Sequence, residues 1–191
     1  MTFAPLQNLL HLLRAGLLSV LSAAALLASA AASADELRDL QALLRQGKTT
    51  EALARIEKAL SERPKDAQLR FLKGVALTDS GKAADAAQVF TGLTQDFPEL
   101  PEPYNNLAAI LASQGAFDKA RVALEMAIRL NPGYAVAHEN LGDVYARLAA
   151  QAWNRSLELE ANNAAAKAKL AQVRDIIAPK DAGRASGRPV R

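Results

Sequence analysis

Side chains that could carry out chemistry are scarce in this 191-residue chain. Cysteine is absent, so disulfides, thiolate metal ligands and cysteine nucleophiles are excluded. Of the two histidines, His11 lies in an apolar amino-terminal stretch, and His138 stands alone in the rest of the chain. A metal or acid–base site needs several converging groups, and the carboxylates show no ligand spacing. We therefore expect no enzyme activity, no metal and no cofactor.

The composition predicts an all-helical protein with a nearly neutral folded region. Half of the residues are apolar, only 5% are aromatic, and the apolar content is mostly alanine and leucine, which favour helices. The formal net charge is +3, but the carboxy-terminal stretch 178–191 holds four cations and one acid. The basic charge thus belongs to a tail that we expect to be disordered, and no basic face indicates nucleic-acid binding.

The amino terminus is typical of an export signal. Residues 15–34 carry no charge, Arg14 precedes them, and an acidic pair follows. The triplets Ala28–Ala30 and Ala32–Ala34 fit the small-x-small pattern of signal peptidase cleavage. We expect residues 1–34 to be a signal peptide cleaved after Ala34, which predicts a periplasmic or extracellular protein. The alternative is an uncleaved membrane anchor, since about 20 apolar residues can cross a bilayer.

Several residue classes recur with a period of 34 residues. The glycines of the period predict helix ends, where a positive φ is often needed, and the prolines predict the end of each following helix. The alanines permit close helix approach, and the large residues four positions later fill the space between helices. The recurring residues are Gly47, Gly81 and Gly115; Ala52, Ala86 and Ala120; Ile56, Phe90 and Leu124; and Pro64, Pro98 and Pro132.

This period predicts helical hairpins. The expected helix pairs are 35–46 with 49–61, 66–79 with 82–95, and 101–113 with 116–129. The set of residues resembles the tetratricopeptide repeat, a helix–turn–helix unit of 34 residues, over residues 35–161. The stretch 104–132 is the closest unit, with Tyr104, Leu107, Leu111, Gly115, Ala120, Leu124, Ala127 and Pro132 at family positions and Ala108 where glycine is usual. The first unit departs from the family pattern at Leu40, where a small residue belongs.

The fourth unit lacks five residues at its turn. The residues matching Ala120, Leu124 and Ala127 are Ala149, Trp153 and Ser156, each five positions early. We therefore predict one continuous helix over about 135–160, with only Gly142 inside it to weaken it. Asn162 and Asn163 favour a reversal, after which a capping helix over 162–177, helical from about 164 and bearing Leu170, Val173 and Ile177, should fold back and cover Trp153. The alternative is that a second chain provides the cover.

The resemblance implies that the first helices of the units line a concave groove. The implied groove residues are Leu37, Gln41, Leu44, Arg45, Phe71, Val75, Thr78, Asp79, Asn105, Asn106, Ala109, Ala112, Glu139, Asn140, Asp143 and Arg147. In related repeats an asparagine at the place of Asn106 and Asn140 can hold a peptide backbone, although it can also simply fit the helix surface. The lysines with which some family members grip a terminal carboxylate are missing. An extended peptide with an apolar side chain suits this groove.

His138 falls at the place that Tyr104 has one unit earlier, and we interpret it as a partly buried packing residue. The resulting hypothesis is a periplasmic adaptor that binds a protein or peptide partner, as a monomer or homodimer, without nucleic acid and without a membrane contact beyond an uncleaved signal. Two alternatives remain: a self-associating scaffold of the cell envelope, and an enzyme or accessory domain acting on cell-wall polymer, for which no residues are found. The basic tail could touch anionic lipid, although a solvated tail is the simpler interpretation.

Overall fold

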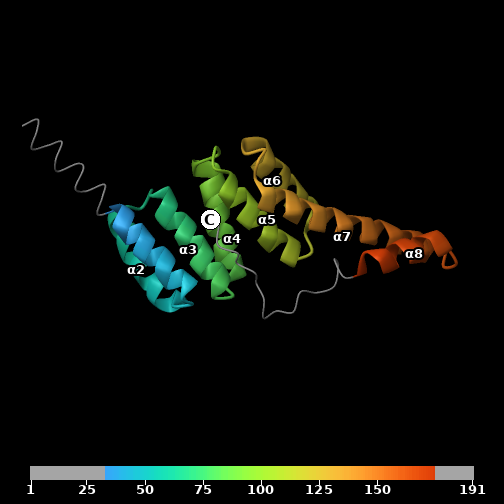
Figure 1. Ribbon diagram of the computed structural model, residues 1–191, viewed down its shortest axis with the longest axis horizontal. Coiled ribbons are helices and arrows are strands. Elements are labelled where there is room, and N and C mark those ends of the chain that lie inside the picture. Colours follow the sequence, from blue (N-terminus) through green and yellow to red (C-terminus); the bar gives the residue numbers. More distant parts are fainter. Residues whose placement is uncertain (1–32, 175–191) are drawn as a thin grey trace, which may run out of the picture.

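The computed structural model describes residues 33–174, in which every regular element is helical and no strand occurs. Residues 33–45 are helical. The helices that follow are α2 (Thr49–Glu62), α3 (Ala67–Asp79), α4 (Ala83–Asp96), α5 (Pro101–Ser113), α6 (Phe117–Leu130), α7 (Ala135–Leu159) and α8 (Ala164–Gln172). Each packs against its neighbours in the chain, so the molecule is an elongated stack of hairpins (Figure 1). The predicted all-α solenoid is confirmed.

The predicted boundaries of α2 to α6 agree with the structure to within one residue at each end. The glycines explain the ends of the first helices, because Gly47, Gly81 and Gly115 have φ values of +72°, +73° and +76°. Beyond each glycine, a backbone N–H reaches back to the last turn of the helix; the amide of Lys82 donates to the carbonyl of Leu77 at 2.9 Å. This is the Schellman closure that a left-handed residue permits.

The small and large residues of the period interlock between the two helices of a unit. The three alanines at the start of the second helices, Ala52, Ala86 and Ala120, are fully buried, and Phe90 is also 0% exposed. A Cβ placed on Gly74 of α3 would lie 2.6 Å from the ring of Phe90, closer than atoms can pack. Glycine is therefore required at this position of unit two, because the phenyl ring of α4 occupies the space of a side chain.

Helix α7 confirms the prediction for the fourth unit. It runs without interruption for 25 residues from Ala135 to Leu159, across the place where a turn would lie in a regular repeat. Its second half extends beyond the stacked hairpins, and α8 lies alongside that half (Figure 1). The reversal follows the predicted asparagines, since the Asn163 side chain caps α8 by accepting a hydrogen bond of 3.0 Å from the amide of Ala166.

Some predictions fall on residues that the structure does not describe. These are nearly all of the signal segment 1–34, the basic tail 178–191, and the end of the predicted capping helix around Ile177. The described part of that helix ends at Gln172. Between residues 33 and 174, no helix combines the length and the hydropathy that a membrane crossing would need.

Candidate functional site

The candidate site is the row of side chains on the first helices of the units. These helices are residues 33–45, α3, α5 and α7. On α3, Phe71, Val75 and Thr78 are half-buried, and on α5, Ala109 is exposed. Gln41 and Arg45 are exposed on the first helix, and Glu139 is exposed on α7. The row therefore offers apolar surface on α3 and polar side chains on α5 and α7.

Two of the predicted asparagines meet at the junction of units three and four. The amide nitrogen of Asn140 on α7 donates to the amide oxygen of Asn105 on α5 at 2.9 Å. Asn105 is only 6% exposed and is the one buried polar residue among those described, whereas Asn140 is half-buried. A buried amide is costly unless it is hydrogen-bonded, so this bond fixes the spacing of the two helices.

Other predicted groove residues already have intramolecular contacts. The side-chain nitrogen of Asn106 donates to the Glu102 carbonyl of its own helix at 2.9 Å, and the Thr78 hydroxyl donates to the Gly74 carbonyl at 2.9 Å. Each keeps an oxygen that can accept a further hydrogen bond. The ring of Phe71 packs edge-on against Phe90 with centroids 5.7 Å apart, which holds it in place while one side remains accessible.

The end of the row on α7 is tied to α6. The guanidinium of Arg147 lies 5.8 Å above the centre of the Phe117 ring, and Asp143 is half-buried and engaged within the molecule. The cation–π contact was not predicted from the sequence, because Phe117 and Arg147 belong to different units. The signal that could have indicated it is an aromatic residue at the start of α6, where units one and two have Thr49 and Ala83.

Asp79 lies at the carboxyl end of α3. Although the residue as a whole is exposed, desolvation of its carboxyl by the neighbouring protein raises the pKa above the ordinary value of 3.8, because loss of water disfavours the charged form. A raised pKa in the folded state means that stability is lost as the pH rises through that pKa. The carboxylate also lies at the negative end of the helix dipole, which disfavours it further.

Replacing Asp79 by asparagine should therefore raise the melting temperature at neutral pH. The gain should vanish as the pH falls to the ordinary carboxyl value of 3.8, where the parent residue is protonated as well. Thermal melts of the two proteins from acidic to neutral pH would measure it. A gain that is equal at every pH would show that ionisation of Asp79 is not its cause.

The interpretation of His138 as a partly buried packing residue is wrong, because the side chain is exposed. Its Nε2 lies 3.0 Å from the Pro132 carbonyl oxygen. Tyr104, at the same place in unit three, is half-buried, and its hydroxyl donates to the carbonyl oxygens of Thr94 in α4 and of Pro98 at 3.3 and 3.4 Å. The shorter imidazole of His138 reaches the carbonyl of Pro132, the equivalent of Pro98, and stays exposed. No cluster of three metal-ligating side chains occurs in the described range, and His138 has no ligand set around it.

Sequence comparisons identify the repeats directly. A family model described as "Tetratricopeptide repeat" matches residues 37–101, and one described as "TPR repeat" matches residues 108–148. The chain belongs to the tetratricopeptide repeat family. Such repeats are typically interaction modules without enzymatic activity, and they bind through extended concave surfaces.

Three solved structures illustrate the likeness. The first tetratricopeptide domain of human RPAP3 is 19% identical, with a TM-score of 0.57 over 60% of this chain and 90% of that one. TTC0263 of Thermus thermophilus is 24% identical, with a TM-score of 0.56 over 77% and 92%. YrrB, whose structure is described as "a TPR protein with an unusual peptide-binding site", is 22% identical, with a TM-score of 0.51 over 55% and 54%. These likenesses establish the fold.

Proposed function

We propose that this tetratricopeptide protein is an adaptor of the bacterial periplasm that binds an extended peptide segment of another protein along the row of first-helix side chains. The observation that carries the proposal is the combination of a fixed apolar surface at Phe71 and Val75 with amide groups on the two following units. An apolar side chain of the peptide would lie against Phe71. The amide oxygens of Asn106 and Asn140 would accept hydrogen bonds from the backbone of the peptide.

A contact between two of the first helices also supports peptide binding in this groove. The Asn140–Asn105 hydrogen bond holds α5 and α7 in a fixed relation, so a ligand that spans both helices meets a preorganised surface. YrrB, with its peptide-binding site, shows that the shared fold can hold a peptide. The missing lysines argue for binding within a segment rather than at a free carboxyl terminus.

Replacing Phe71, Asn106 or Asn140 by alanine should weaken capture of the partner while the helix content stays unchanged. An aromatic side chain that becomes fully buried at an interface can contribute more than ~2 kcal/mol, so Phe71→Ala should reduce affinity at least about 30-fold. Crosslinked partners from envelope extract, compared by quantitative mass spectrometry between the parent and each variant, would measure the loss.

Val122→Ala is the matched control, because Val122 is an apolar side chain, 58% exposed, on the second-helix surface of unit three. It should capture the same partners as the parent. If all three groove variants retain the partners as well as Val122→Ala does, the groove is not the binding site.

The export part of the proposal has a separate test. Amino-terminal sequencing of protein recovered from the cell envelope is expected to begin at Asp35. Recovery of a membrane-bound form that retains the segment before Asp35 would favour the anchored alternative.

A further inference from the structure

Unit four lacks the internal contact that closes the other three units. In units one to three, all residues at the three second-helix positions are buried: Ala52, Ile56 and Ala59; Ala86, Phe90 and Leu93; and Ala120, Leu124 and Ala127. The matching residues of unit four, Ala149, Trp153 and Ser156, are only half-buried. This part of α7 thus presents a second-helix face without a complete cover.

The first half of α7, which corresponds to the first helix of unit four, lacks the side chains of a second helix packed against it. Gly74 is buried beneath Phe90, whereas a Cβ on Gly142, at the same place in unit four, would meet no atom within 4 Å. Tyr145, at the place of the buried Leu77, is 49% exposed. The surface of α7 at Gly142 is therefore open, with no side chain of the same chain packed over it.

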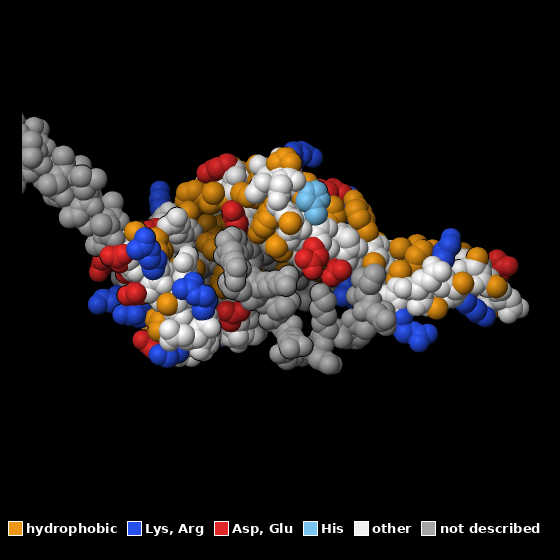
Figure 2. Space-filling model, viewed as in Figure 1, with side chains coloured by type: hydrophobic (Ala, Val, Ile, Leu, Met, Phe, Trp, Pro, Cys, Tyr) orange, Lys and Arg blue, Asp and Glu red, His pale blue; other side chains and the backbone are white. Residues whose placement is uncertain are grey.

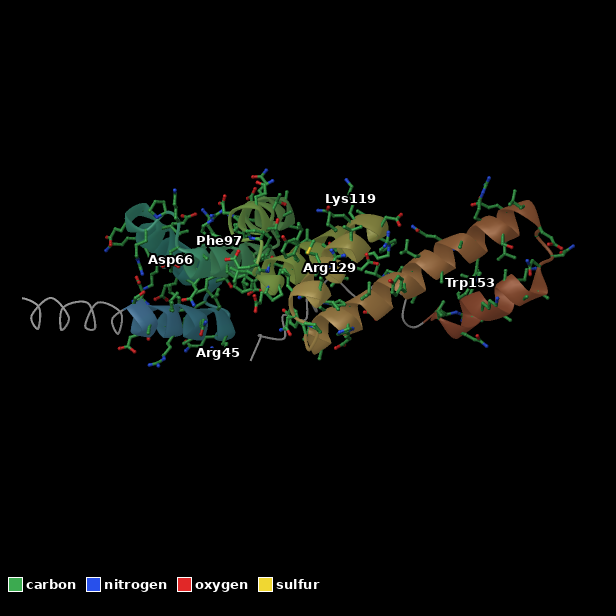
Figure 3. The ribbon with its side chains drawn as sticks, turned by 90° about the horizontal axis from the view of Figure 1, so that it is seen from above. Arg45, Asp66, Phe97, Lys119, Arg129 and Trp153 are labelled. Carbon is green, nitrogen blue, oxygen red and sulfur yellow. The ribbon has the colours of Figure 1, made fainter. Side chains whose placement is uncertain are left out.

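The two incompletely covered surfaces of α7 cannot pack against each other within one chain. Gly142, Tyr145, Ala149 and Trp153 follow helical spacing and share one side of α7. Gly142 and Trp153 are separated by about 16 Å along the axis at ~1.5 Å per residue. The helix is straight, so the Trp153 ring cannot reach the Gly142 site of its own chain. Figure 3 instead shows Trp153 on the α7–α8 arm, where the Lys169 ammonium is 5.9 Å from its ring centre.

We propose that a second copy of this chain covers this face, with the two α7 helices packed antiparallel about a two-fold axis near Leu148. Trp153 of each copy would then fill the site at Gly142 of the other, as Phe90 fills the site at Gly74 within unit two. The arrangement is isologous, so both copies form the same contact twice. A hinge too short to turn is a known route to such exchange, and here the turn lacks five residues.

A dimer of this kind would continue the repeat packing that the helices of one chain already show. Ala166 and Leu170 of α8, and Val173 directly after it, follow Ala137, Leu141 and Val144 by 29 residues, which is the repeat period less the five missing residues. Helix α8 thus acts as the first helix of a fifth unit and already packs on the second-helix half of α7. In the dimer, α6 would be followed by the first half of α7, then by the second half of the other copy's α7, and then by the other copy's α8. This order would reproduce a regular solenoid on each side.

Charge also favours this partner. The arm, residues 149–174, carries four basic and two acidic side chains, and Figure 2 shows apolar side chains on its surface between these cations. The helices that would receive it, residues 101–148, carry four basic and five acidic side chains. The opposite balance of the two surfaces favours docking of one copy on another, and the small residues Gly142, Ala146 and Ala149 allow close approach at the crossing. This inference does not depend on the peptide groove.

Sedimentation equilibrium of the full chain, as purified, tests the proposal. The expected mass is twice that of one chain. Insertion of a copy of residues 114–118 between Arg147 and Leu148 restores the period of 34 and should give a single chain, because each unit four can then close on itself. A single-chain mass for the parent at the highest concentration measured would overturn the proposal.

Gly142→Leu supplies a test that does not depend on a new turn. The position is open in one chain, so helix content by circular dichroism should be retained, but the leucine would occupy the site of the other copy's Trp153 and abolish the dimer. The emission of Trp153, the only tryptophan, should shift to longer wavelength at the same time. Gln151→Leu, exposed on the opposite side of α7, is the control and should leave the dimer intact. Equal masses for the two variants would contradict the exchanged arrangement.

Discussion

Replacing Phe90 by alanine is expected to lower the free energy of unfolding by about 3–5 kcal/mol. Phe90 is 0% exposed and contacts Phe71 and Gly74 of α3, so its removal leaves a cavity between the two helices of unit two. Because a domain of this size is stable by only about 5–15 kcal/mol, this single change should bring the protein close to unfolding. Urea denaturation followed by circular dichroism would measure the loss.

The pairing with Gly74 gives this prediction its control. Gly74→Ala should also destabilise, since its Cβ would lie 2.6 Å from a buried ring that has little room to move. Unit three contains the pair Ala108 and Leu124 at the same places, both buried. Combining Gly74→Ala with Phe90→Leu should therefore recover stability relative to Gly74→Ala alone. If Gly74→Ala is as stable as the parent, the interlock is not what selects glycine here.

A proline at Leu148 is expected to cost roughly 3 kcal/mol beyond the loss of the leucine side chain. Leu148 lies within α7, where a regular repeat would have its turn, and its amide belongs to the helical ladder. Proline removes that hydrogen bond and clashes with the preceding turn of the helix. Thermal or urea unfolding of Leu148→Pro would show the loss.

Leu148→Ala separates the backbone effect from side-chain packing, because Leu148 is half-buried against the core of units three and four. The difference between the two variants reports the helical backbone alone. A proline variant no less stable than the alanine variant would indicate that the chain already turns at this position.

The sequence predicted the fold because the repeat period places one physical requirement at the same point in every unit. Glycine ends the first helix through a positive φ, as Gly47, Gly81 and Gly115 do. The same period, with five residues missing, predicted the uninterrupted α7. These features depend on neighbours close in sequence, and such features can be inferred from one chain.

The candidate site was less predictable, because its contacts join different units. The period placed Asn105 and Asn140 on adjacent first helices, but it gave no sign that Asn105 is buried and accepts the hydrogen bond of Asn140. For His138, the period predicted the burial of a regular unit. The structure exposes it, because its imidazole is shorter than the phenol of Tyr104, which reaches both the Thr94 and the Pro98 carbonyl, while His138 lies next to the Pro132 carbonyl. Whether a side chain is buried depends on the other elements that pack over it, and the residue pattern of a single helix does not show them.

The course of α7 is the central claim, because the open fourth unit and the docking of a second copy both depend on it. The chain has no cysteine, so spin labels can be attached at cysteines introduced at Val136 and Glu158, which are both exposed. The distance between them is best measured by pulsed electron resonance, with labelled protein diluted into unlabelled protein to remove contributions between chains. A continuous helix predicts a narrow distribution near about 33 Å at ~1.5 Å per residue. A distribution below about 15 Å, as two antiparallel helices with axes ~8–10 Å apart would give, would contradict the account.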